Sequence, residues 1–157
     1  MKVQEIFLVI FISFLLIATH CEKAVNAEFP LIIDNNSSFN IAVYFNENEQ
    51  YQALYPDTVI SNFRERVILN INKKENQDIA GSPNWESTFE VSAPKDTLSL
   101  FVFHSDTVNE YSWEKIRKEY KILTRYDLSL QDLENRNFIL EYPYDPSLGK
   151  LKIWPKK

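Results

Sequence analysis

Residues 95–133 read KDTLSLFVFHSDTVNEYSWEKIRKEYKILTRYDLSLQDL, and this stretch decides the fold class. Its first part, residues 97–104, alternates as a β-strand does, but both alternating sets of side chains are apolar. The two sets are Leu98, Leu100 and Val102 on one side, and Phe101 and Phe103 on the other. Since a strand that is apolar on both faces is covered on both faces, residues 97–104 are predicted to lie in the middle of a sheet.

The rest of the stretch changes period twice. Residues 112–120 carry apolar side chains at spacings of three and four with charged residues between them, which is typical of a surface helix. The apolar stripe consists of Trp113, Ile116 and Tyr120. Residues 122–128 return to a strand pattern. Ser129 with Asp132 three positions later then resembles a capping box, which predicts the start of a helical turn.

Outside this stretch, period-two alternation and turn-forming residues predict further short strands. These are residues 31–33, 39–46, 58–61, 67–71, 85–91, 138–142 and 151–154. The first two are expected to form a hairpin, and residues 72–84 are expected to be a long polar loop. The spacing predicts a mainly β, β-sandwich-like fold of seven to nine short strands, with one or two short helices between the late strands.

Length and charge limit the choice of architecture and partner. A chain of 157 residues with 45% hydrophobic residues is large enough for one domain with a core and short for two, so residues 30–157 are predicted to form a single domain. The net charge of −5 disfavours a nucleic-acid partner, because binding to phosphates needs an excess of Lys and Arg.

The N-terminal segment predicts export. Residues 6–18, IFLVIFISFLLIA, form an apolar run of signal-peptide length that is short for a full membrane span. Residues 18–21, ATHC, resemble a lipoprotein cleavage site. Cleavage there makes residues 1–20 a signal peptide and residues 21–29 a tether. Cleavage after Ala27 would instead release a soluble secreted protein, and an uncleaved N-terminal anchor is the third alternative.

Cys21 is the predicted lipidation site. It is the one cysteine of the chain, so it cannot form an intramolecular disulfide, and an unpaired thiol in an exported protein needs another role. Attachment of a lipid supplies that role. The expected location is therefore the cell envelope, with the protein held to the membrane by a lipid anchor.

The sequence contains no recognisable catalytic set. Its two glycines lie in no phosphate-binding pattern, and His104, the one histidine outside the predicted leader, ends an apolar strand, where a structural role is expected. The loop residues Asp57, Asp96 and Asp106 are each followed by Thr, which favours turns over a calcium loop. We therefore predict no enzyme activity, no cofactor and no metal site. A hydrolase with an unrecognised carboxylate pair stays an alternative.

The aromatic residues allow a binding role. Trp154, next to Pro155 near the end of the chain, and Trp85 are candidates for an exposed platform that binds a sugar or a peptide. Core packing is the competing explanation for both rings, and it explains Trp113 on its helix stripe.

Residues 96–143 also carry a sequence pattern that consists of Y-S-W, I-R, Y-x-I-L-x-R-Y-D-L-S-L-x-D-L and a final Y-P. This pattern resembles a family of small uncharacterised exported proteins and lipoproteins of gut Bacteroidales. The resemblance is weaker at residues 55–58, and the last five residues, IWPKK, depart from the tail typical of the family. Membership would imply a lipid-anchored envelope protein with a relaxed cleavage site, and it implies no activity. The expected role is binding or scaffolding of an extracytoplasmic ligand or protein.

Overall fold

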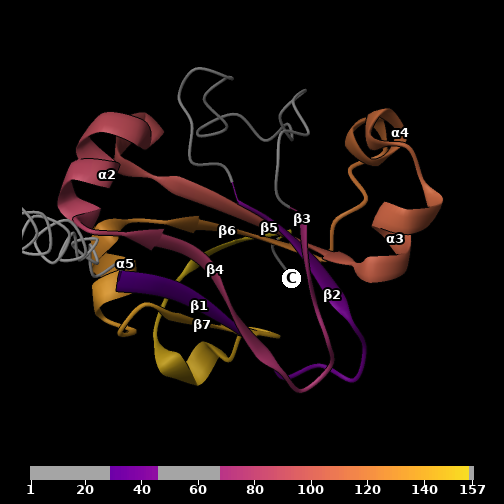
Figure 1. Cartoon of the computed structure of the whole chain (residues 1–157), viewed down its shortest axis with the longest axis horizontal. Helices are drawn as coiled ribbons and strands as arrows, with labels where there is room; N and C mark the ends of the chain where they lie inside the picture. Colours follow the sequence, from indigo (N-terminus) through magenta and orange to yellow (C-terminus); the bar gives the residue numbers. More distant parts are fainter. Residues whose placement is uncertain (1–28, 46–67, 156–157) are drawn as a thin grey trace, which may run out of the picture.

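The computed structural model describes residues 29–45 and 68–155. Within these residues the chain forms eight strands in two sheets and four short α-helices (Figure 1), so the predicted mainly β, sandwich-like fold is confirmed. The strands are β1 (Phe29–Asn35), β2 (Ile41–Phe45), β3 (Ile68–Ile71), β4 (Asn76–Ser82), β5 (Leu98–His104), β6 (Thr124–Leu128), β7 (Ile139–Tyr142) and β8 (Lys152–Trp154). The helices are α2 (Trp85–Ser92), α3 (Ser105–Glu110), α4 (Trp113–Lys118) and α5 (Leu130–Glu134), with 3₁₀ turns η2 (Pro94–Asp96) and η3 (Pro146–Leu148). The predicted leader, Cys21 and the strand predicted at residues 58–61 lie outside the described residues.

The larger sheet has the strand order β3-β2-β5-β6-β8, and its neighbouring strands are antiparallel. Its central strand, β5, is buried on both faces, as its two apolar sets predict. One set, with Leu100 and Val102, packs in the core between the two sheets. The other set, Phe101 and Phe103, packs under α3 and α4 on the outer face.

The smaller sheet has the order β4-β1-β7, with β1 antiparallel to β4 and parallel to β7. Because β1 and β2 lie in different sheets, the predicted hairpin is wrong. The cause is the buried side chain of Asn35, which donates to the carbonyl oxygens of Phe39 at 2.9 Å and Asn72 at 3.0 Å. Its Oδ1 accepts a hydrogen bond from the Ser37 hydroxyl at 2.6 Å. These bonds fix a corner that carries the chain from one sheet to the other.

Two pairs of helices close the ends of the sandwich. Figure 1 shows α2 beside α5 at one end, and α3 with α4 at the other. Trp85 and Phe89 of α2 and Leu133 of α5 join the core between the sheets. Val108 of α3 and Ile116 of α4 cover the outer face of the larger sheet.

Helix α2 replaces the strand predicted at residues 85–91. The Asn84 side chain caps the helix by accepting the Ser87 N–H at 2.9 Å. Trp85 and Phe89 lie four residues apart and are both buried, whereas Val91 is 65% exposed. A spacing of four satisfies period two and period 3.6 alike, so the apolar positions did not distinguish the two structures.

Two other elements differ from the sequence prediction. Strand β4 lies within the segment expected to be a loop. The sequence did not predict this strand because Ile79 is its one buried large apolar residue, so its apolar pattern is weak. Helix α3 begins directly after β5, where no helix was predicted. The predicted helix at residues 112–120 is confirmed as α4. The capping box is confirmed too, because Asp132 accepts the Ser129 N–H at 2.9 Å.

Among the described residues, no helix has the length and apolar character that a membrane crossing requires.

Candidate functional site

Trp85 belongs to the core, and it reaches the surface only at the wall of a pocket that Phe29 and Phe138 also line. Its side chain is 5% exposed, its indole N–H donates to the carbonyl oxygen of Phe29 at 2.9 Å, and its ring stacks on Phe138 with centroids 5.6 Å apart. Burial of this ring closes the inter-sheet core beside α5. The structure thus shows a packing role for Trp85, and a ligand platform there stays a prediction.

Trp154 is half-buried and holds β8 to a polar cluster on the outer face of the larger sheet. Its indole N–H donates to Asp127 Oδ2 at 3.0 Å. The same carboxylate accepts from Arg125 Nε at 2.7 Å and Nη2 at 3.1 Å, and from the Ser99 hydroxyl at 2.9 Å. We call these four residues, Ser99, Arg125, Asp127 and Trp154, the Asp127 cluster.

The Asp127 cluster is built around a buried ion pair between Arg125 and Asp127. Arg125 is 1% exposed and Asp127 2%. Burial by itself would lower the pKa of the Arg125 guanidinium, but hydrogen bonds to Asp127 and its charge, with help from Tyr120, raise it above its ordinary value. The Arg125 guanidinium thus stays charged and is bonded to the Asp127 carboxylate, as a buried charge must be paired to be tolerated. The cluster ties β5, β6 and β8 together.

His104 lies apart from the Asp127 cluster. Strand alternation places it on the face of β5 opposite to Ser99, so the two side chains do not form a catalytic pair. Its Nδ1 accepts the Asp106 N–H at 3.3 Å and caps α3, and its ring stacks on Phe39 with centroids 4.8 Å apart. These contacts give His104 a structural role at the strand end.

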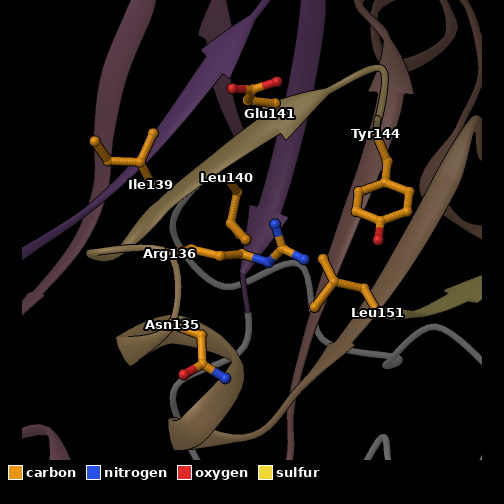
Figure 2. Close-up of a pocket in the computed structure, with 7 residues that line it drawn as sticks. All are labelled: Asn135, Arg136, Ile139, Leu140, Glu141, Tyr144 and Leu151. Carbon is orange, nitrogen blue, oxygen red and sulfur yellow. The ribbon is translucent and has the colours of Figure 1, made fainter. Parts of the chain in front are cut away.

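A pocket of about 240 Å³ opens where the smaller sheet ends at β7. Its walls come from β7, from the residues that follow α5, and from the segment between β7 and β8 (Figure 2). The lining residues are Asn135, Arg136, Ile139, Leu140, Glu141, Tyr144 and Leu151. The pocket thus lies at the side of the sandwich, between β7 of the smaller sheet and the segment that leads to β8 of the larger sheet.

Arg136 carries the positive charge of this pocket. Its guanidinium lies over the Tyr144 ring, 5.5 Å from the ring centroid, and the Tyr144 hydroxyl donates to the Gly149 carbonyl oxygen. Figure 2 shows the guanidinium beside Leu140 and Leu151, with the Glu141 carboxylate on the other side of β7. Among the described residues no carboxylate pairs with Arg136, and its guanidinium forms no hydrogen bond.

One edge of β7 faces this pocket. The carbonyl oxygens of Phe138 and Tyr142 both accept hydrogen bonds from the β1 side, at 2.9 and 2.7 Å. In a parallel pair the residues that bond to a given neighbour alternate, so Ile139 and Glu141 direct their main-chain groups to the other edge. Since β7 ends the sheet in the part of the chain that the structure describes, no strand there pairs with that edge.

Ile139 and Glu141 each direct an N–H and a carbonyl oxygen to this edge, and two of these four groups are already bonded. The Ile139 N–H donates to the Arg136 carbonyl oxygen at 3.0 Å, and the Glu141 carbonyl oxygen accepts the Tyr126 hydroxyl at 3.0 Å. The Ile139 carbonyl oxygen and the Glu141 N–H are left at the pocket edge. Burial raises the pKa of the Tyr126 hydroxyl well above its usual range, so Tyr126 remains a donor to Glu141.

The described residues contain no group of three His, Cys, Asp or Glu side chains close enough to hold a metal ion. Asp96 lies in the 3₁₀ turn η2 and Asp106 in helix α3, and Asp57 lies outside the described ranges.

No protein-family model, no curated protein and no solved structure matches this chain.

Sequence reasoning did not find Arg136. It lies in the segment NRNF between α5 and β7, where a charged residue is ordinary. The Asp127 cluster had a visible signal, since Arg125 and Asp127 alternate with the apolar Tyr126 and Leu128 of one strand. Such alternation is normally assigned to a solvated face, and only the fold shows that this face is covered.

Proposed function

We propose that this protein is an exported cell-envelope protein, anchored to the membrane through a lipid on Cys21, whose β-sandwich has a binding or scaffolding role and no catalytic one. The observation that carries the binding role is the pocket beside β7, where Arg136 is held over Tyr144 without a carboxylate partner among the described residues. A charge positioned in a pocket and left unpaired is available to a ligand.

The anchor rests on the sequence. The apolar run at residues 6–18, the ATHC motif and the position of Cys21 as the one cysteine together favour a lipoprotein. The resemblance to exported proteins of gut Bacteroidales adds to this interpretation. A secreted soluble protein beginning at Glu28 is the alternative. In that case the pocket would serve a diffusible binding module for a carbohydrate or a peptide.

Metabolic labelling tests the anchor. A bacterium with lipoprotein processing that produces the full-length protein is grown with an alkyne analogue of palmitate. A second culture produces the Cys21→Ser variant. We expect label and membrane fractionation for the natural chain and neither for the variant. An unlabelled mature protein that starts at Glu28 by mass spectrometry would replace the lipoprotein by the secreted form.

A further inference from the structure

We propose that the pocket beside β7 binds the C-terminal end of a peptide, with the terminal carboxylate on Arg136 and the last residues bonded to the free edge of β7. The proposal rests on the binding role proposed above and names the ligand class of that site.

The charge of the pocket selects a carboxylate. Of the seven lining residues only Arg136 is a cation, and the planar guanidinium binds a carboxylate through two parallel hydrogen bonds. A phosphate would bring about two negative charges to a single cation. In a chain with a net charge of −5, a singly charged carboxylate is the better match for a lone guanidinium.

The main-chain groups at the edge select a peptide. The Ile139 carbonyl oxygen and the Glu141 N–H flank Leu140 and point to the same side. One residue of an extended peptide running parallel to β7 presents an N–H to the first group and a carbonyl oxygen to the second. This is strand addition shortened to one residue, followed by capture of the terminal carboxylate.

The size of the pocket selects a chain end over a longer strand. A volume of about 240 Å³ is below the range of roughly 300–1,000 Å³ typical of pockets for drug-sized ligands. Within residues 29–45 and 68–155, the edge offers one carbonyl oxygen and one N–H without a partner, because the other two groups of Ile139 and Glu141 are bonded within the protein. Leu140 and Leu151 make the wall beside the guanidinium apolar (Figure 2), which favours an apolar last residue.

Calorimetry with matched peptides tests the proposal. The mature full-length protein, purified in detergent, is titrated with N-acetyl-alanyl-valyl-leucine and with the same tripeptide as its C-terminal amide. The two probes differ in the terminal charge alone. We expect the free acid to bind at least tenfold more tightly than the amide, since hydrogen bonds to charged groups contribute more than tenfold in affinity.

Variants place the binding at Arg136. Arg136→Gln is expected to abolish the preference for the free acid, because it removes the charge and keeps a polar side chain of moderate length. Lys150→Gln is the matched control, since Lys150 is an exposed cation in the same segment as Gly149 and Leu151 that does not line the pocket. It should keep the preference within about twofold. Equal affinity for acid and amide, no binding of either at millimolar concentration, or an unchanged preference in Arg136→Gln would overturn the proposal.

The two proposals fail in different ways. If neutral oligosaccharides bind with equal affinity to the natural chain and to Arg136→Gln, the binding role survives and the peptide terminus does not. If the free acid is preferred but the protein carries no lipid label, the ligand class stands and the anchored location falls.

Discussion

Arg125 and Arg136 belong to the same domain and lie in opposite settings. Arg125 is 1% exposed and fixed by two hydrogen bonds to the Asp127 carboxylate. Arg136 lies in an open pocket, rests on an aromatic ring, and has no carboxylate partner among the described residues. The Arg125 guanidinium is bonded within the protein, whereas the Arg136 guanidinium is positioned by the fold and is available to a ligand.

The difference separates a structural charge from a recognition charge. A buried ion pair in which each partner satisfies the other contributes little that a ligand can use, and removing one partner strands a charge in the core. A positioned, unpaired charge contributes little to folding and much to binding. The two arginines therefore predict opposite responses to mutation, and each prediction below tests that contrast.

The largest effect is expected for Asp127→Ala. It leaves the Arg125 guanidinium buried without its carboxylate, which should lower the free energy of unfolding by about 3–5 kcal/mol in urea titrations. The control is Asp78→Ala, which removes an exposed carboxylate from β4 and should change stability by about 0.5 kcal/mol or less. If the two variants are equally stable, Arg125 and Asp127 do not form the structural pair described above.

Trp154→Phe should have the next largest effect. It removes the indole N–H that donates to the charged Asp127, and we expect a loss of about 1.5–3 kcal/mol. Trp85→Phe is the matched comparison, because its indole N–H donates to the neutral carbonyl of Phe29, a bond that contributes about 1 kcal/mol. Thermal unfolding of both variants measures the difference. A larger loss in Trp85→Phe would mean that ring packing outweighs the bond to Asp127.

Tyr126→Phe removes the hydroxyl that donates to Glu141, and a loss of about 0.5–1.5 kcal/mol is expected at neutral pH. Burial raises the pKa of Tyr126 in the folded protein, so the folded state keeps a proton that the unfolded chain loses near pH 10. The stabilisation is therefore complete below about pH 10 and declines as the pH rises further.

The pH dependence supplies the measurement. Urea unfolding of the natural chain should become easier as the pH rises above about 10, and the slope should be shallower in Tyr126→Phe. Parallel slopes would show that Tyr126 ionises alike in the folded and unfolded states.

The smallest effect on stability is expected for Arg136→Gln. The lost contact is a guanidinium over a partly exposed ring, so the free energy of unfolding should fall by about 0.5 kcal/mol. Urea titration beside Asp127→Ala gives the comparison directly. A loss of several kcal/mol would assign Arg136 to the same structural class as Arg125 and remove the main support for the ligand pocket.

The sequence predicted the parts of this fold in which the pattern of residues fits a single local structure. Strand β5 has two apolar faces, so a mid-sheet position was the consistent assignment. The Ser129 and Asp132 spacing predicted a capping box that forms in the structure. In both cases neighbouring residues settle the outcome without help from distant ones.

Prediction failed where distant contacts decide. Trp85 and Phe89 fit a strand and a helix equally, and the cap at Asn84 together with burial against Phe138 and Leu133 settles the helix. The predicted hairpin is wrong because the Asn35 side chain bonds to Ser37 and to Asn72. Strand alternation does not encode these contacts. Arg136 acquires its role from Tyr144 and from the edge of β7, neither of which is visible from its own neighbours.

The pairing of β1 has a consequence for how the molecule assembles. Ile32 pairs with Asp78 on one side and with Ile139 on the other, so the second partner of β1 comes much later in the chain than the first. Contacts so far apart in the sequence slow folding, because a long loop must close before they form. The larger sheet can begin with the neighbouring hairpin-like pair β5 and β6, whereas the edge of β7 exists only after β1 has been recruited. A chain in which β7 has not yet paired with β1 would thus have no pocket, and ligand binding would report that folding is complete.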